Sequence, residues 1–241
     1  MNALKAYFKN THTLLYSFLF SLPLLLLYEI LILVSQPSGE SMVRISVDVW
    51  IKTLFSVFGT STLSITLLVV AVLSAFILYK ERDKFNTLRF GNFFILLIEC
   101  TILAVVVAFL SQNIVQLVLN ANASGAAADL SYLQQIALSL GAGLYEELFF
   151  RVLLVSALIW FFDKLFTKKW ASITAAVVLS ATLFSAVHYI GSLGDPFTIG
   201  SFLYRFTFGL FLNLIYVLRG FGVAAWTHAI YDLLVITFFI S

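Results

Sequence analysis

Long apolar runs separated by short polar segments dominate this chain of 241 residues. A run of about 20 apolar residues is long enough to cross a bilayer as a helix. The pattern predicts seven spanning helices, at residues 13–34, 62–79, 91–119, 131–162, 170–189, 197–218 and 221–240. Two of these runs, 91–119 and 131–162, are longer than one crossing needs, so we expect those helices to be tilted or to extend beyond the bilayer.

The polar segments between the runs predict loops and one surface helix. Pro37 to Gly39 end the first run, Asn120 to Asp129 are small and polar, and Gly191 to Pro196 indicate a tight turn. Residues 43–58 are apolar except for three charges spaced four residues apart, which places them on one helical face: Arg44, Asp48 and Lys52. This arrangement predicts a helix at the membrane interface.

Composition agrees with this pattern, because 61% of the residues are hydrophobic and only 11% are charged. A soluble domain contains about 25% charged residues. We therefore expect an all-α polytopic membrane protein, a bundle of about seven to eight transmembrane helices around a polar cavity. The bundle is expected to form one domain over residues 1–241, with the motif-bearing core at about 131–240. The single cysteine, Cys100, lies in an apolar run and is interpreted as a small packed residue.

The distribution of basic residues predicts the orientation in the membrane. With the N-terminus inside, ten of the fourteen Lys and Arg residues fall in inner segments and two in outer ones. The other two, Arg151 and Arg205, fall within predicted spans. Basic residues concentrate in cytoplasmic loops, so the sequence favours an inside N-terminus. No basic cluster has the interleaved aromatic residues of a nucleic-acid site, so nucleic acid is not an expected partner.

Glu146 and Glu147 lie near the middle of the fourth predicted span, with Arg151 one turn later. Ionisable groups inside a membrane are costly and are functional candidates by default. Glu147 and Arg151 share a helical face and are expected to pair. Glu146 is rotated about 100° away, toward a cavity, where burial beside a second carboxylate would make it a base active near neutral pH. A purely structural ion pair is the alternative, and it leaves Glu146 without a partner.

Two further pairs lie in the fifth and seventh spans. Phe184 lies one turn before His188, and His228 lies one turn before Asp232. A carboxylate at this spacing orients an imidazole or joins it as a metal ligand. Each pair alone is more often a packed polar contact, but three such motifs in one small chain favour a site.

Other intramembrane polar residues have simpler interpretations. Glu99 and Arg205 are expected to pair with each other, and Glu29 is expected to reach the interface. Asn213 is expected to form a hydrogen bond between helices. The sequence contains no His-Glu-x-x-His zinc motif and no Gly-x-Ser-x-Gly nucleophile motif.

The three motifs resemble those of the CPBP family, the CAAX prenyl-protease and bacteriocin-processing membrane proteases. Their order and spacing match over about residues 140–235: Glu146-Glu147-x-x-x-Arg151, Phe184-x-x-x-His188 and His228-x-x-x-Asp232. The resemblance implies an intramembrane endopeptidase acting on a peptide or lipid-anchored protein. CAAX cleavage, bacteriocin maturation or self-immunity, and peptide-signal processing are the candidate roles. A bacterial or archaeal cytoplasmic membrane is the expected location.

The resemblance also implies a role for each motif residue. Glu146 would activate a water molecule with help from His188, while His228 and the residue at 232 would stabilise the oxyanion. Glu147, Arg151 and Phe184 would shape and orient the site. Many relatives have asparagine where this chain has Asp232, and an ionised aspartate only accepts hydrogen bonds. Asp232 would instead be protonated, orient His228 or bind a metal.

The preferred mechanism uses no metal, and zinc held by Glu146, His188, His228 and Asp232 is the alternative. A non-catalytic scaffold or bacteriocin-immunity protein of the same fold, and a proton-coupled transporter, are alternative functions. One conflict remains in the predicted map. It separates His188 and His228 by more than about 15 Å in depth, so either the turn at 218–221 is sunk into the membrane or the fifth span starts deeper than residue 170.

Overall fold

The computed structural model describes residues 3–35, 44–45, 47–50, 53, 62–119, 130–190 and 194–238, with the side chains of 3, 62–67 and 114–119 excepted. These residues are mostly helical and include no strand, which confirms the all-α class. The helices are α1 (Ala3–Thr11), α2 (Leu14–Ser35), α4 (Thr62–Lys80), the 3-10 helix η1 (Arg82–Thr87), α5 (Phe90–Leu119), α6 (Tyr132–Gly141), the π-helices η2 (Ala142–Glu146) and η3 (Leu148–Val155), α7 (Ser156–Phe162), α8 (Lys169–Val187), α9 (Ile199–Arg219) and α10 (Phe221–Phe238).

Five described helices are long and apolar enough to span a membrane: α2, α5, α8, α9 and α10. Their bounds agree closely with five of the predicted runs. The other two runs are also helical but are not among these five spans. Run 62–79 forms α4, of which Leu68–Lys80 is described in full and forms a shorter apolar helix. Run 131–162 is divided among α6, η2, η3 and α7. The predicted number of seven to eight spans is therefore not confirmed.

Predictions for several polar segments fall outside the described residues, namely 36–43, 120–129 and 191–193. The predicted surface helix at 43–58 is described only in part, with helix at 47–50. Its Asp48 is wrongly placed by the prediction, because the side chain is fully buried rather than at an interface. The carboxylate accepts a hydrogen bond from the Tyr28 hydroxyl of α2 at 2.8 Å and pairs with Arg44 at 2.9 Å.

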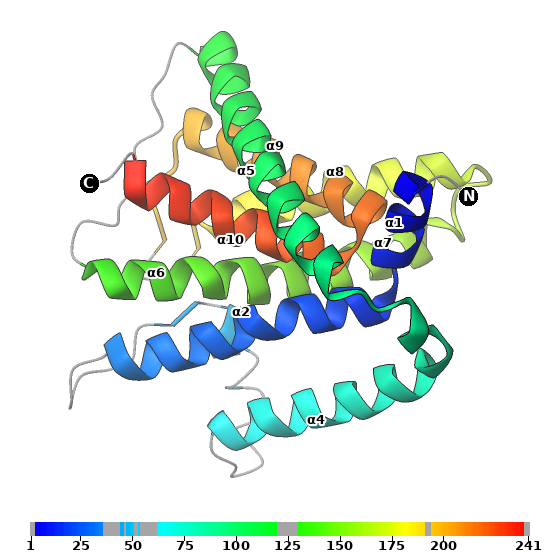
Figure 1. Ribbon diagram of the computed structural model, residues 1–241. Helices are drawn as coiled ribbons and strands as arrows, with labels where there is room; N and C mark the ends of the chain where they lie inside the picture. The colour runs from blue at the N-terminus through cyan, green and yellow to red at the C-terminus, as the bar shows by residue number, and fades with distance from the viewer. Residues whose placement is uncertain are drawn as a thin grey trace.

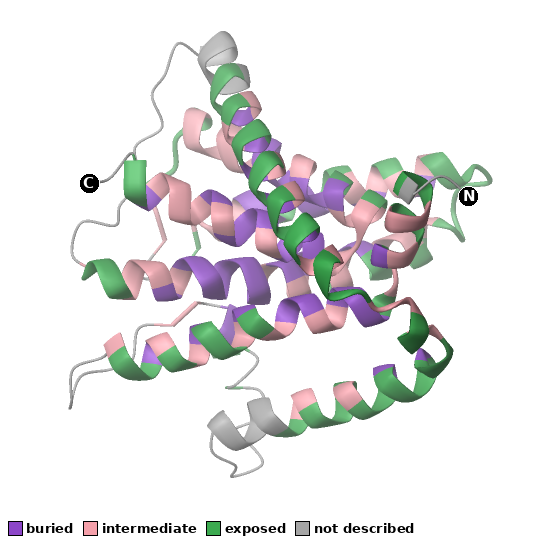
Figure 2. Cartoon of the chain, viewed as in Figure 1, coloured by how far each residue is buried: buried purple, intermediate pink, exposed green. Residues whose placement is uncertain are grey.

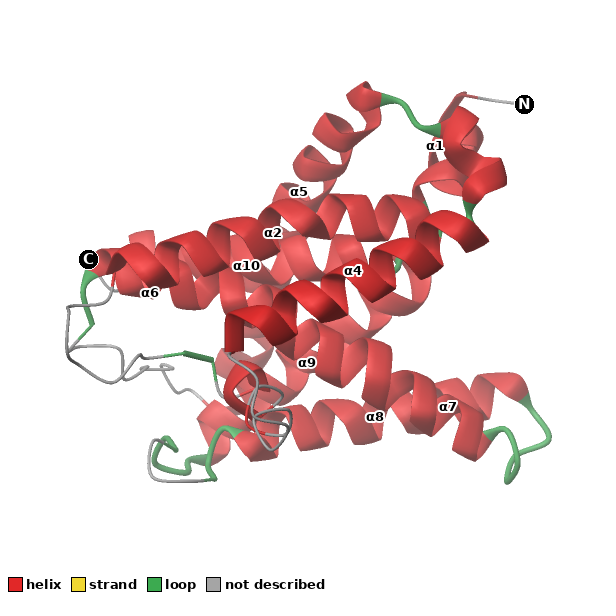
Figure 3. Ribbon diagram, turned by 90° about the horizontal axis from the view of Figure 1, so that it is seen from below, coloured by secondary structure: helices red, strands yellow, loops and turns green. Residues whose placement is uncertain are grey.

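Helix α10 is the centre of the bundle. In Figure 1, α2, α6 and α10 run alongside one another, and α5 crosses them obliquely. Helix α4 lies at the edge next to α2. Figure 3 shows α7, α8 and α9 on another side of the bundle. Half of the spanning residues of α10 are buried, against a third or fewer in the other four spans. Figure 2 shows the same gradient, with buried residues concentrated in α10 and α6 and exposed ones along α4 and α5.

Polar contacts between helices confirm one prediction and correct two. The Asn213 amide of α9 donates to the Val177 carbonyl of α8 at 2.8 Å, as expected. Glu99 does not pair with Arg205 but with Arg219, at 2.5 Å. Arg205 lies fourteen residues earlier on α9, about 21 Å away along the axis, and therefore cannot reach the same carboxylate. Glu29 turns inward and accepts hydrogen bonds from two buried or half-buried groups, Arg44 and Tyr145.

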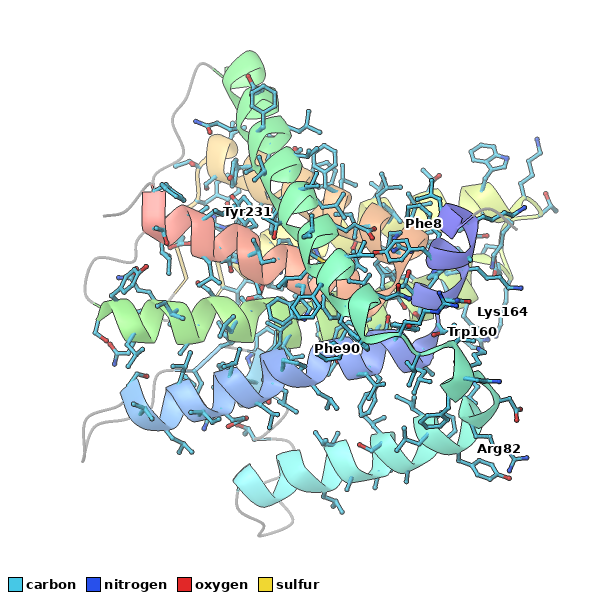
Figure 4. The ribbon with its side chains drawn as sticks, in the orientation of Figure 1. Phe8, Arg82, Phe90, Trp160, Lys164 and Tyr231 are labelled. Atoms are coloured by element: carbon cyan, nitrogen blue, oxygen red, sulfur yellow. The ribbon has the colours of Figure 1, made fainter. Side chains whose placement is uncertain are left out.

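The predicted inner segments gather at one end of the molecule. Figure 1 places α1, the junction of α4 with η1, and the connection between α7 and α8 at this end. Figure 4 labels Phe8, Arg82, Trp160 and Lys164 there, with Tyr231 toward the opposite end. The Lys164 ammonium lies 3.3 Å from the ring centroid of the exposed Trp160. Such basic and aromatic side chains are typical of a membrane–water interface.

This arrangement predicts which end is cytoplasmic. In a Cys100→Ala background, we expect Tyr132→Cys to react with a membrane-impermeant maleimide in intact bacterial cells. Lys168→Cys, at the basic end, should react only after the membrane is permeabilised. Both positions are exposed, whereas Cys100 is buried. Labelling of Lys168→Cys in intact cells would show that the orientation is reversed.

Candidate active site

The first motif lies on a helix whose central part is π-helical. η2 and η3 flank Glu147, so the backbone between Gly141 and Val155 is wound more widely than in an α-helix. π-helical segments are rare and are often found at functional sites. Here the wide turns continue on both sides of the two glutamates and include Arg151, so the local backbone sets the direction of all three charged side chains.

Two glycines allow this helix to touch its neighbours closely. A Cβ atom at Gly143 would lie 2.6 Å from the Ala225 carbonyl oxygen and 2.7 Å from the Ala229 backbone nitrogen, both on α10. At Gly141 it would lie 2.4 Å from the Tyr28 ring of α2. The absence of side chains at these positions therefore brings η2 against the backbone of α10, the helix that bears the last motif.

Glu147 is the connection between the first and last motifs. Its Oε1 lies 2.9 Å from Arg151 Nη1 and 2.7 Å from His228 Nδ1. Glu147 and Arg151 are fully buried and His228 nearly so. The predicted Glu147–Arg151 pair is therefore confirmed, and the same carboxylate also binds the histidine. A buried charge is costly unless it is paired and hydrogen-bonded, and Arg151 provides that pairing for Glu147.

The contact with Glu147 fixes the orientation of His228. An ionised carboxylate only accepts hydrogen bonds, so Nδ1 of His228 carries the proton. Nε2 then points away from Glu147 and lies 3.5 Å from the Asp232 carboxylate, one turn later on α10. The predicted approach of His228 and Asp232 is confirmed, but the group that orients the ring most closely is Glu147.

An aromatic cluster joins the second motif to the other two. The Phe184 ring lies 4.6 Å from the Arg151 guanidinium carbon, a cation–π distance. Ring centroids are 5.0 Å apart between Phe184 and His188, and 6.2 Å apart between Phe184 and His228. Phe208 of α9 closes the cluster, 5.0 Å from His228.

These contacts contradict the predicted separation of the two histidines. Because Phe184 touches both histidines, their rings are separated by no more than the two centroid distances combined, and the predicted separation of more than about 15 Å is wrong. Helix α8 begins at Lys169, so the fifth span does not start deeper than predicted. The α9–α10 turn packs against the first turn of α2, where the Gly222 amide donates to Ser17 Oγ at 3.2 Å.

The site has a buried part and an exposed part. Glu147, Arg151 and His228 are buried, whereas Glu146, His188 and Asp232 are half-exposed. Glu146 interacts electrostatically with Arg151, His228 and Asp232. Nδ1 of His188 is hydrogen-bonded to the Phe184 carbonyl at 2.7 Å, which leaves Nε2 as the nitrogen available for other contacts. The three half-exposed groups are those that a substrate could reach.

The described residues contain no group of three or more His, Cys, Asp or Glu side chains placed to hold a metal ion. Part of the reason is visible at His228, where Glu147 and Asp232 approach opposite ring nitrogens and cannot share one ion with that ring.

Sequence reasoning missed Gly143 and Phe208. Phe208 is one of 25 phenylalanines and carries no distinguishing signal. Gly143 follows Gly141 in an otherwise apolar run, a pattern that indicates close approach of backbones. Tyr204 and Tyr231 were also missed; their hydroxyls meet between α9 and α10, next to Asp232, and Tyr231 is labelled in Figure 4.

Comparison with known proteins agrees with the motif analysis. Residues 128–234 match the family model of type II CAAX prenyl endopeptidases, Rce1-like. The match contains every residue of the three motifs and confirms the resemblance seen in their spacing. Searches of curated proteins and of solved structures found no significant match.

The close approach at Gly143 leads to a stability prediction. Gly143→Ala should destabilise the protein by about 1–3 kcal/mol, the usual cost of overpacking, because the nearest atoms are backbone atoms of α10. Gly91→Ala is the matched control, since a Cβ there meets nothing within 4 Å. Thermal unfolding in detergent measures both variants. Equal midpoints would contradict the close packing of η2 on α10.

Proposed function

We propose that the protein is an intramembrane endopeptidase, because residues 128–234 match the model of the Rce1-like family of type II CAAX prenyl endopeptidases. It would hydrolyse a peptide bond in a membrane-associated peptide or lipid-anchored protein. The observation that carries the proposal is the single carboxylate of Glu147, which contacts both Arg151 and Nδ1 of His228 in the buried part of the site. The groups proposed to react, Glu146, His188 and Asp232, lie in the half-exposed part of the site.

Glu146 is the proposed base. It is half-exposed, lies on the π-helical segment and interacts electrostatically with Arg151, His228 and Asp232. It would take a proton from a water molecule as that water attacks the scissile carbonyl, and His188 Nε2 would assist in the proton transfer. General base catalysis of this kind contributes about 10²–10⁴-fold to a rate.

His228 is the proposed stabiliser of the tetrahedral intermediate. Glu147 holds the ring by Nδ1, so that Nε2 points toward the exposed part of the site beside Asp232. When Nε2 also carries a proton, it donates to the developing oxyanion. A protonated Asp232 would donate as well.

The substrate class follows from the family and from the location of the site. CAAX-type prenylated peptides are the first candidates, and bacteriocin or signal peptides are the second. All are chains that a membrane presents to a half-exposed intramembrane site.

The central test is loss of the base. Glu146→Gln should lower the cleavage rate of a farnesylated CAAX peptide or of a peptide from a library by about 1000-fold, measured with purified protein in detergent. Glu99→Gln is the matched control, because Glu99 is also an intramembrane carboxylate but pairs with Arg219 away from the motifs. A Glu146→Gln enzyme with full activity would exclude this residue as the base. A wild-type protein that cleaves nothing would favour the scaffold or immunity function.

The proposed mechanism also predicts the effect of chelators. Because a glutamate activates the water, 1,10-phenanthroline should leave the cleavage rate unchanged. Cleavage that is lost with the chelator and restored by zinc would establish a metal centre instead.

Asp232 offers a sharper test of the oxyanion site. Asp232→Asn should keep the rate within about tenfold of wild type, since the amide supplies a hydrogen-bond donor. Asp232→Leu should lower it by about 10²–10³-fold, the usual effect of removing an oxyanion donor. An inactive Asp232→Asn enzyme would show that the negative charge is needed, and that Asp232 orients His228 rather than stabilising the oxyanion.

A further inference from the structure

His188 lies outside the helix that leads to it. Helix α8 ends at Val187, and His188 and Tyr189 form a turn that follows the helix. A residue in such a turn is positioned by fewer backbone hydrogen bonds than a residue within a helix. The position of His188 must therefore depend on other contacts of the surrounding chain.

Two groups beside His188 are fixed to α9. The Asp195 amide donates to the His188 carbonyl at 2.9 Å, so Asp195 holds the backbone of the histidine directly. Tyr189, the next residue, shares a hydrogen bond of 2.7 Å with the Ser201 hydroxyl in the first turn of α9. Of these two contacts, the one made by Tyr189 attaches the turn directly to α9.

Arg205 of α9 binds both of these groups. Its Nη2 forms an ion pair with the Asp195 carboxylate, and its Nη1 donates to the Tyr189 hydroxyl at 2.9 Å. The guanidinium carbon also lies 5.2 Å from the Tyr189 ring centroid. A planar guanidinium presents several donors in a fixed geometry, so one side chain can hold Asp195 and Tyr189 at once.

We propose that Arg205 is a positioning residue for His188, which it holds in the active site through Asp195 and Tyr189. The inference rests on the proposed function, because it concerns the histidine that assists water activation. None of the described contacts of Arg205 is to His188 itself, so the effect passes through the backbone of the turn. The ion pair is partly exposed, with 20% of the Arg205 side chain and 30% of the Asp195 side chain accessible. Arg205 nevertheless binds both the residue that follows His188 and the residue whose amide holds the His188 carbonyl.

The first experiment measures how well the backbone amides of the turn are protected from exchange, and it does not depend on activity. Hydrogen–deuterium exchange of peptides covering residues 186–198 should become at least about tenfold faster in Arg205→Met, because the Asp195 amide loses its protected environment. Arg205→Lys keeps the charge but not the planar group, and should give an intermediate rate. Arg219→Met is the matched control: it breaks a similarly buried ion pair with Glu99 at another part of α9, and should leave exchange at 186–198 unchanged.

The second experiment asks whether the turn matters for catalysis. Arg205→Met should lower kcat for peptide cleavage by about tenfold with little change in KM, since Arg205 would act on His188 rather than on the substrate. Arg205→Lys should recover part of the loss. Arg219→Met should leave kcat near the wild-type value once the fraction of folded protein is matched.

The outcomes distinguish failure of the positioning role of Arg205 from failure of the proposed peptidase function. Unchanged exchange at 186–198 in Arg205→Met would overturn the positioning role, whatever the activity. Faster exchange with an unchanged kcat would overturn it as well, because the turn would then move without consequence for the reaction. A wild-type protein without peptidase activity would contradict the proposed function alone, and exchange would still report whether Arg205 holds the turn.

Discussion

The structure depends on one buried carboxylate. Glu147 lies fully out of water, and its Oε1 contacts both Arg151 on its own helix and His228 on α10. Removing Arg151 would leave the charge of Glu147 without compensation in a low-dielectric interior, which costs several kcal/mol. The contact therefore fixes the position of two helices that are far apart in sequence, and it also sets the ring orientation that the proposed chemistry needs. Stability and site geometry follow from the same interaction.

The remaining features of the site support that contact. Gly143 lets the backbones of η2 and α10 approach closely enough for Glu147 to reach the imidazole, and Phe184 covers the guanidinium that balances its charge. The half-exposed groups surround this rigid centre. Glu146 and Glu147 are consecutive residues, yet they have different roles. Glu147 is the structural carboxylate, and Glu146 is the proposed catalytic base.

Much of this could be predicted from the sequence, because the membrane imposes strong rules. Apolar runs placed the helices correctly to within a few residues, and spacing of four residues identified the Glu147–Arg151 and His228–Asp232 pairs. The prediction failed where partners come from distant segments. Nothing in the sequence shows that Glu99 meets Arg219 instead of Arg205, or that Glu147 reaches His228 across 81 positions. The π-helical winding was also beyond prediction, since the hydrophobic pattern of the run suits an ordinary α-helix. The predicted separation of His188 and His228 was wrong because Phe184 contacts both rings, which span counting could not show.

The close packing of Gly141 and Gly143 on neighbouring helices has a consequence for how such a site tolerates insertions and deletions. Adding or removing one residue turns every later side chain of a helix by about 100° relative to the earlier ones. Between Gly141 and Glu147, a deletion of one residue would therefore keep the whole helix and its hydrophobicity, but would rotate Glu147 away from His228. Substitutions at many lipid-facing positions are compatible with this architecture, whereas the number of residues between the close-packed glycines and the glutamates is not free to change.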